Sequence, residues 1–267
     1  MMRHVNNVAY VDYLQEARID MFTSHPEFHG GEDLGDGVVV VRHELEFLAP
    51  LVFRSRPVRV DSWITEIRAA SFTMAYEVYD EGDSGRTVYL RASSVLTPFV
   101  FAAERPRRIT DVEREVLGRY LEPAEPRPPL SRDGTARYTY PLRVRWSDVD
   151  AYRHVNNVKY VEYFQEARIR YLMHMHQDGD AFGHLAVARL DIDYRRPILF
   201  RLAAYEVHSW VSHVGRSSFT VAAEVRDGDQ LLASSRAVLV GFDSETQRAA
   251  PLTPDQRERL LGQLETG

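Results

Sequence analysis

The sequence of 267 residues contains no cysteine. This absence excludes a disulfide framework, a cysteine nucleophile and thiolate metal ligands. The sequence also lacks any run of about 20 apolar residues, the length that a membrane-spanning helix needs. Its first ten residues, MMRHVNNVAY, do not have the charged-then-apolar layout of a signal peptide. We therefore expect a cytoplasmic protein with no membrane partner.

Charge and motifs exclude several further classes of function. The chain has 33 basic and 39 acidic residues, and the basic ones do not gather into the stripe that nucleic-acid binding requires. It has no glycine-rich dinucleotide fingerprint, no P-loop, no H-E-x-x-H and no G-x-S-x-G. His174 and His176 have neither the helical spacing nor the zinc-ligand spacing. We expect no nucleic-acid partner, no metal and no redox cofactor.

What the sequence does contain is an internal repeat. Residues 3–19 read RHVNNVAYVDYLQEARI and residues 153–169 read RHVNNVKYVEYFQEARI, with 14 identities over 17 positions. Weaker matches follow in the same order, first at an offset of 147 residues and then, after the turn EGDSGR at 81–86, at an offset of 143. Because length changes are confined to polar turns, the two halves should share one fold.

The segment between the copies, EPAEPRPPLSRDG, has four prolines and no periodicity. We interpret it as a semi-rigid linker at 122–134, which separates repeat 1 at 1–121 from repeat 2 at 135–267.

Each copy has one helix followed by strands. In repeat 2, Asn156 or Asn157 can cap a helix over 158–173, whose apolar side chains cover more than one stripe and so indicate an enclosed helix. Alternating apolar residues predict a strand over 186–194, and 202–214, 217–226 and 231–242 are also rich in β-forming residues. A short helix opened by a capping box, at Thr110 or Thr253, closes each copy.

The most informative motif is RWSDVDAYRHVNN at 145–157. It resembles the signature of hotdog acyl-CoA thioesterases of the 4-hydroxybenzoyl-CoA thioesterase type, and also the motif of plant acyl-ACP thioesterases. This resemblance, together with the repeat, implies an α+β tandem double hotdog, in which an antiparallel sheet wraps a long central helix in each copy. The two repeats would pair within the chain with their sheets edge to edge, which would cover edge strands that otherwise invite aggregation. Further homo-oligomerisation is left open.

The resemblance also implies roles for individual residues. Asp150 matches the catalytic carboxylate, Asn157 the residue whose backbone N–H polarises the thioester carbonyl, and His154 a histidine of the acyl-ACP branch. Two positions depart from the family pattern: Arg153 replaces a common glycine and would narrow the pocket mouth or bind a phosphate, and Tyr152 replaces an asparagine of the acyl-ACP branch. The implied substrate is therefore acyl-CoA rather than acyl-ACP.

The chemistry is consistent with these residues in its own right. Hydrolysis of a thioester needs a base or nucleophile and a donor aimed at the developing oxyanion, whereas the leaving thiolate, with a conjugate-acid pKa near 8.5, needs no strong acid. A carboxylate near a helix N-terminus is held ionised by the helix dipole, and the first-turn N–H groups are free donors. Asp150 would activate water or attack the acyl carbon itself.

Structural interpretations stand beside these functional ones. Asp148 and Asp150 can cap a turn, Asn156 and Asn157 can cap the helix, and His154 can belong to the core; we favour the structural role for Asp148 and the catalytic role for Asp150. The sequence also leaves open a non-catalytic acyl-CoA binding protein and a hotdog hydratase or lyase.

Repeat 1 offers fewer site residues. Asn7 matches Asn157 at the helix tip and, with Arg153, is a candidate substrate-binding residue. Ser71 and Ser218, which match each other near the start of a strand, are candidates to reach across the pair of repeats to the thioester, and the interpretation as ordinary turn or strand serines is favoured over this one. The residue of repeat 1 that would match Asp150 falls one position before Met1. The strand that would match residues 137–147 is absent as well, which should leave unpaired backbone and an exposed apolar margin on repeat 1. We expect either a lost first site or, as the favoured alternative, a start codon upstream of Met1, which a native mass above 30.7 kDa would reveal.

Overall fold

A computed structural model describes residues 4–24, 34, 37–82, 85–150, 153–175, 185–243 and 248–264. The chain divides into two compact units, Met1–Arg127 and Pro128–Gly267, and the division lies inside the predicted linker. Of the positions named above, Met1, Tyr152, His176, the first residue of the repeat at 3–19 and the middle of the turn at 81–86 lie outside the described residues.

The proline-rich segment is attached to both units at points along its length. At its start, the Glu122 N–H donates to the Ile64 carbonyl at 2.8 Å within unit 1. Further along, the Trp210 indole N–H donates to the Asp133 carbonyl at 2.9 Å within unit 2. The start of the segment is therefore bonded to unit 1 and its end to unit 2.

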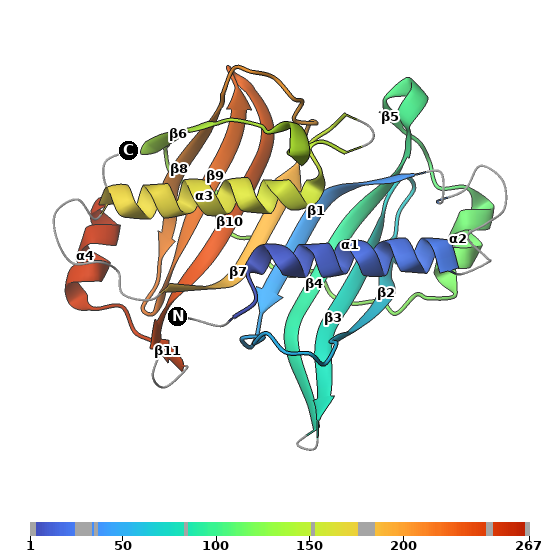
Figure 1. Ribbon diagram of the computed structural model, residues 1–267, viewed down its shortest axis with the longest axis horizontal. Helices are drawn as coiled ribbons and strands as arrows, with labels where there is room; N and C mark the ends of the chain where they lie inside the picture. The colour runs from blue at the N-terminus through green and yellow to red at the C-terminus, as the bar shows by residue number, and fades with distance from the viewer. Residues whose placement is uncertain are drawn as a thin grey trace. The chain divides into compact units, whose positions relative to one another are not determined.

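Unit 1 consists of one long helix on an antiparallel sheet (Figure 1). Its elements are α1 (Asn7–Ser24), β1 (Val38–Phe47), β2 (Arg59–Ile67), β3 (Phe72–Gly82), β4 (Gly85–Val100), a 3-10 turn (Phe101–Ala103), β5 (Arg105–Pro106) and α2 (Asp111–Gly118). The strands pair in the order β2-β3-β4-β1, which leaves β2 at one edge of this unit's sheet.

Unit 2 repeats this plan and adds a strand at the corresponding edge. Its elements are β6 (Tyr138–Leu142), a 3-10 turn (Trp146–Asp148), α3 (Asn157–Met175), β7 (Leu185–Tyr194), β8 (Tyr205–Val214), β9 (Ser218–Asp227), β10 (Gln230–Asp243), β11 (Arg248–Ala250) and α4 (Pro254–Gly262). The strands pair in the order β7-β10-β9-β8-β6, all antiparallel. Strand and helix bounds agree with the predicted segments to within a few residues.

The central helices are enclosed because their apolar residues are not confined to one stripe. Along α3, Val158, Val161, Phe164, Ala167 and Tyr171 are all buried. The short closing helices begin as the sequence predicts: the hydroxyls of Thr110 and Thr253 each accept from the backbone N–H three residues on, completing both capping boxes.

The imidazole of His174 packs on the ring of Tyr138, with centroids 5.1 Å apart. None of the helices in the described ranges from residue 4 to residue 264 is long and apolar enough to cross a membrane.

Candidate active site

Asp150 lies in a tight turn that brings the chain back to the start of α3. The Asp150 N–H donates to the His154 carbonyl at 2.8 Å, and the Arg153 N–H donates to the Asp150 carbonyl at 3.0 Å. Val149 and Val155 form an antiparallel bridge across this turn. The Asp150 carboxylate is half-buried, and its Oδ1 accepts from the His154 N–H at 3.3 Å. The turn therefore holds Asp150 at a fixed place beside the helix tip.

Asp148 has the structural role that the sequence favours for it. Its side chain is 4% exposed, and its Oδ2 accepts from the Arg145 N–H at 2.8 Å and from the Tyr163 hydroxyl at 2.6 Å. Burial and the bond to Asp148 raise the pKa of Tyr163, so this hydroxyl stays protonated and donates. The Asp148 carbonyl also accepts from the Asn156 N–H at 2.9 Å. Asp148 thus ties the turn to the helix.

The N-terminus of α3 presents a free backbone donor. Of the two asparagines proposed as caps, Asn156 is the cap: its Oδ1 accepts from the Val158 N–H at 2.9 Å, and its carbonyl accepts from the Lys159 N–H at 2.9 Å. Within the part of the chain that the structure describes, the Asn157 N–H has no acceptor. The positive end of the helix dipole lies at the same place, so this N–H can stabilise an oxyanion.

Two tyrosines, Tyr160 and Tyr194, lie at this helix tip, and the sequence analysis assigned a site role to neither of them. The Tyr160 hydroxyl accepts from the Ile198 N–H at 3.0 Å, and burial, with a smaller contribution from the Asp150 charge, raises the pKa of Tyr160. The Tyr194 hydroxyl donates to the Asn157 carbonyl at 3.1 Å, and its ring packs edge-on against Tyr160 at 5.0 Å.

A difference between the two repeats at this position could have pointed to Tyr194. The matching residue of unit 1 is Phe47, which packs against Tyr10 in the same way at 5.5 Å but carries no hydroxyl. Only unit 2 therefore has, at this position, a hydroxyl that can donate to the carbonyl at the helix tip.

His154 contacts Asp150 through its backbone. Its N–H reaches the carboxylate, and the residue forms a bridge to Leu199, while its half-buried imidazole makes no hydrogen bond to a described residue. His154→Ala keeps the backbone bond, so we expect kcat to fall less than about tenfold with KM unchanged. A loss of about 100-fold, the size typical of a proton-transfer group, would show that the imidazole itself takes part in the reaction.

Arg153 is one of two described non-glycine residues with a left-handed backbone, at φ 65°, the other being Glu104 at φ 48°. A left-handed residue with a Cβ costs roughly 1–2 kcal/mol, which explains why glycine suits this position. The Arg153 side chain is exposed. A strained and solvent-facing arginine is consistent with a contact to a substrate phosphate.

Replacing Arg153 separates strain from charge. Relief of the strain, less the roughly 0.4–1 kcal/mol of chain entropy that glycine loses on folding, should make Arg153→Gly about 0.5–1 kcal/mol more stable. The same variant should raise KM for an acyl-CoA about two- to fivefold, as loss of an exposed ion pair does. Melting curves and steady-state kinetics on one preparation measure both effects.

Three controls complete this experiment. Glu104→Gly should stabilise the protein without changing KM, and Arg153→Ala should raise KM without stabilising. An acyl-pantetheine substrate, which lacks the nucleotide, should show no KM change with either Arg153 variant. A KM increase that persists for acyl-pantetheine would contradict the phosphate contact.

Unit 1 contains the same helix tip. The Asn6 Oδ1 accepts from the Val8 N–H at 3.1 Å and the Asn6 carbonyl accepts from the Ala9 N–H at 3.0 Å, so Asn7 occupies the place that Asn157 has in unit 2. No carboxylate turn precedes Asn7 in the described residues, which begin here at His4.

Ser71 and Ser218 lie in matching turns. The Ser71 carbonyl accepts from the Arg68 N–H, and the Ser218 carbonyl from the Gly215 N–H, both at 2.8 Å. Next to Ser71, the ring of Phe72 packs on Phe22 near the end of α1. At 1.5 Å per residue, Phe22 lies about 22 Å along the helix from Asn7. Within unit 1 the structure therefore does not bring Ser71 to the helix tip, and substrate contacts of both serines stay predictions.

These positions define what the site can do chemically. A half-buried carboxylate, an unpaired helix N–H and an exposed arginine lie on one turn and the helix that follows it. This set can deliver a nucleophile to a carbonyl carbon and stabilise the resulting oxyanion.

Comparison with known proteins connects this geometry to a family. The model of the thioesterase-like superfamily matches residues 1–119 and 144–260. Long-chain acyl-CoA thioesterase FadM of Escherichia coli is 28% identical over 127 residues, which are 45% of this chain and 93% of FadM. The chloroplastic palmitoyl-acyl carrier protein thioesterase of Arabidopsis thaliana is 34% identical over 122 residues, which are 41% of this chain and 28% of the relative.

Solved structures agree on the fold. The 12:0-ACP thioesterase of Umbellularia californica superposes with a TM-score of 0.71 at 19% identity, over 93% of this chain and 88% of that chain. A putative oleoyl thioesterase of Lactobacillus plantarum gives a TM-score of 0.68 at 16% identity, over 91% of each chain. The predicted α+β tandem double hotdog is thus confirmed, and because the family model matches both repeats, the chain belongs to the thioesterase-like superfamily of hydrolases.

Proposed function

We propose that this protein hydrolyses an acyl-CoA thioester to a free acid and CoA, with Asp150 as the catalytic carboxylate. The observation that carries the proposal is the unpaired Asn157 N–H at the tip of α3, next to the turn that holds Asp150. A thioesterase needs these two groups together, and an acyl-CoA binding protein without turnover would need neither the base nor a free oxyanion donor.

The reaction follows from their positions. With Asp150 as general base, a water proton passes to the carboxylate while the water oxygen bonds to the thioester carbon. The carbonyl oxygen becomes an oxyanion that accepts a hydrogen bond from the Asn157 N–H. Collapse of this intermediate breaks the C–S bond, and the leaving thiolate takes up the proton from Asp150. With Asp150 as nucleophile, the carboxylate bonds to the acyl carbon, the C–S bond breaks and CoA leaves as the thiolate. Water then hydrolyses the mixed anhydride to the free acid, which restores the Asp150 carboxylate, and the proton released protonates the thiolate.

Two observations favour CoA over a carrier protein as the leaving group. The similarity to FadM, a long-chain acyl-CoA thioesterase, extends over 93% of that relative. The exposed guanidinium of Arg153 also suits a nucleotide phosphate at the mouth of the site.

An assay of free thiol release tests the proposal directly. The same acyl group is offered as acyl-CoA and as acyl-ACP over a series of chain lengths. We expect thiol release with the larger kcat/KM for acyl-CoA. Saturable binding without thiol would indicate a binding protein, and consumption of an enoyl-CoA with the thioester intact would indicate a hydratase. A preference for acyl-ACP would overturn the choice of substrate while leaving the reaction in place.

A further inference from the structure

Two exposed aromatic rings pack together on the surface of unit 2. The centroids of the Trp146 and Phe200 rings are 5.3 Å apart, and the ring planes are nearly perpendicular, at 89°. Trp146 is 75% exposed and Phe200 is 39% exposed. In a perpendicular pair one ring covers at most one face of the other, so a face of the indole stays open. Exposed apolar surface of this kind marks a site of interaction.

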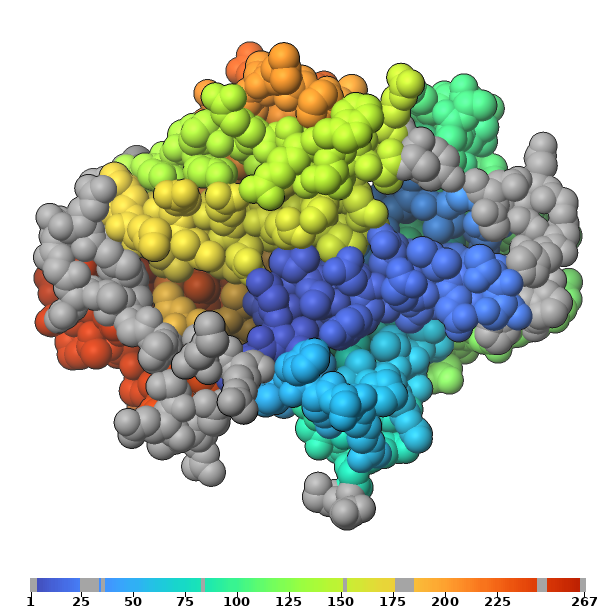
Figure 2. All heavy atoms as spheres, in the orientation of Figure 1, coloured from blue at the N-terminus to red at the C-terminus, as the bar shows by residue number. Residues whose placement is uncertain are grey.

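Trp146 is held in the turn that leads to the proposed catalytic carboxylate. Its carbonyl accepts from the Val149 N–H at 3.4 Å, and the buried Asp148 carboxylate bonds to the Tyr163 hydroxyl on α3 at 2.6 Å. Asp150 follows four residues after Trp146, so the chain allows at most about 14 Å between their Cα atoms. Figure 2 shows the segment before α3, in yellow-green, on the surface beside that helix, in yellow.

Phe200 is held on the same surface by the residues around it. The Tyr205 hydroxyl accepts from the Leu199 N–H at 3.3 Å and donates to the Leu199 carbonyl at 3.0 Å, which fixes the loop immediately before Phe200. Leu199 also forms an antiparallel bridge with His154, whose N–H reaches the Asp150 carboxylate. The aromatic pair and the Asp150 turn are therefore parts of one continuous surface.

Three arginines close to this surface have no anionic partner. Arg153 lies next to the bridged residue His154, and Arg195 and Arg196 directly follow β7, the strand whose last residue bonds to the helix tip. All three are exposed, and none forms an ion pair with a described residue. Arg201, in the same loop as Phe200, is by contrast paired with an aspartate at 2.8 Å. Guanidinium groups that lack a carboxylate are suited to phosphate.

We propose that Trp146 and Phe200 form a stacking platform for the adenine of CoA, with its phosphates bound by Arg153, Arg195 and Arg196. This inference rests on the proposed function, because it places the nucleotide end of the same acyl-CoA. At the end remote from its sulfur, CoA carries a flat aromatic base together with negatively charged phosphates. An open indole face beside unpaired guanidinium groups matches both. An acyl chain, which is uncharged and apolar, suits an enclosed site instead.

Free CoA is the probe, and the tryptophans of the chain report its binding. Trp210 is buried and Trp63 is half-buried, so Trp146 is the tryptophan most open to a stacked base. We expect CoA to quench the tryptophan fluorescence of the protein in a saturable manner. Trp146→Phe keeps an aromatic face, so calorimetry should show an affinity within about threefold of the original, while most of the quenching is lost.

Alanine variants measure the contribution of each ring. Trp146→Ala should weaken CoA binding about five- to 100-fold, the loss that removal of one base-stacking ring causes, and Phe200→Ala should weaken it in the same direction. Met173→Ala, which removes another exposed apolar side chain in the last turn of α3, should leave the affinity unchanged. Melting curves confirm that each variant folds.

Steady-state kinetics locate the contact on the substrate. Trp146→Ala should raise the ratio of KM for acyl-CoA to KM for acyl-pantetheine, which lacks the nucleotide, by the factor found for CoA binding. An equal increase of both KM values would overturn the proposal and place the acyl-pantetheine part on the rings. A larger loss with acyl-ACP than with acyl-CoA would also overturn it and identify a docking surface for the carrier protein.

The binding experiment distinguishes this proposal from that of hydrolysis, because CoA binding is measured without turnover. Unchanged CoA affinity in both Trp146→Ala and Phe200→Ala would overturn the stacking platform, even where thiol release from acyl-CoA is observed. Saturable quenching that Trp146→Phe removes, in a protein that releases no thiol, would support the platform and refute the hydrolysis.

Discussion

Asp150→Asn is expected to lower kcat for thioester hydrolysis by 10³-fold or more, on the order of several kcal/mol in the activation free energy, with no change in melting temperature. Loss of a positioned general base costs about 10²–10⁴-fold, and loss of an attacking carboxylate costs at least as much. The fold should be unaffected because the asparagine Oδ1 can still accept the 3.3 Å bond from the His154 N–H.

Asp148→Asn is the matched control, two residues away and with the same chemical change. Asp148 is buried and bonded to the Arg145 N–H and the Tyr163 hydroxyl, so loss of its charge should weaken these bonds and lower the melting temperature. Any loss of kcat should be smaller than that of Asp150→Asn. Unchanged turnover in Asp150→Asn, or an equal loss in both variants with equal unfolding, would contradict the assignment of Asp150.

The sequence predicts the fold well because the repeat is strong and the local signals are unambiguous. Two copies of one 17-residue segment indicate two copies of one helix, and the capping boxes at Thr110 and Thr253 locate two helix starts. The structure places the start of α3 one residue before the predicted range. Such features depend on neighbours in the sequence, which is why they can be read from it.

The candidate site is less completely predicted because its details depend on contacts between segments far apart in the chain. Asn156 and Asn157 have the same capping chemistry, and only the bond to Val158 shows which one caps the helix. The left-handed backbone of Arg153 has no signal in an arginine side chain. Tyr194 reaches the Asn157 carbonyl from a strand 37 residues away.

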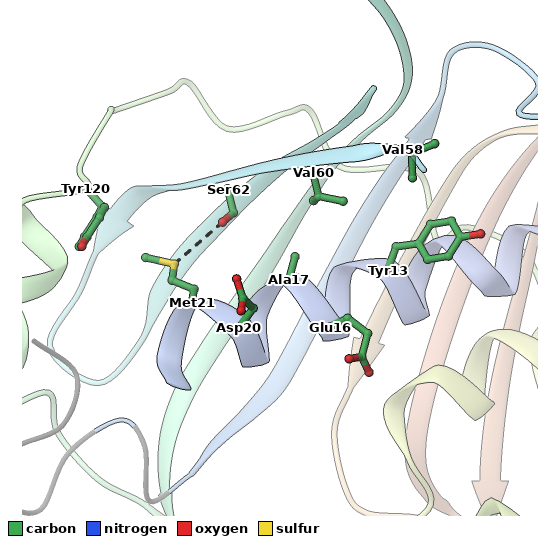
Figure 3. Close-up of a pocket in the computed structure, with 9 residues that line it drawn as sticks. All are labelled: Tyr13, Glu16, Ala17, Asp20, Met21, Val58, Val60, Ser62 and Tyr120. Atoms are coloured by element: carbon green, nitrogen blue, oxygen red, sulfur yellow. Dashed lines mark hydrogen bonds between the residues drawn. The ribbon is translucent and has the colours of Figure 1, made fainter. Parts of the chain in front are cut away.

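The edge of the unit 1 sheet at β2 shows the same difference between features that depend on sequence neighbours and features that depend on distant contacts. The sequence predicts an exposed margin where repeat 1 has no counterpart of β6. It does not predict that Tyr120 and Glu122 bond to Ile64 and so leave residues 58–62 as the open part of the edge. Nor does it show that Asp20 faces the space between α1 and β2, which follows from the packing of α1 on the sheet (Figure 3).

Asn157→Pro is expected to lower kcat about 10²–10³-fold, the usual loss when one oxyanion donor is removed. Asn157 is the first residue of α3, the position at which proline fits a helix best because its missing N–H has no partner within the helix. The Asn157 carbonyl would still accept from the Tyr194 hydroxyl, and Asn156 would still cap the helix. The variant therefore removes the proposed donor and little else.

Asn157→Ala separates the backbone from the side chain. Alanine keeps the N–H and removes the side-chain oxygen, which is buried and has no hydrogen-bond partner among the described residues. We expect kcat of Asn157→Ala to stay within about threefold of the original while Asn157→Pro loses activity, with circular dichroism showing equal helix content in both. If alanine lost as much activity as proline, the side chain would be the active group, and if neither lost activity, the helix tip would not be the oxyanion site, because a single donor in a dry site stabilises the transition state by about 3–4 kcal/mol.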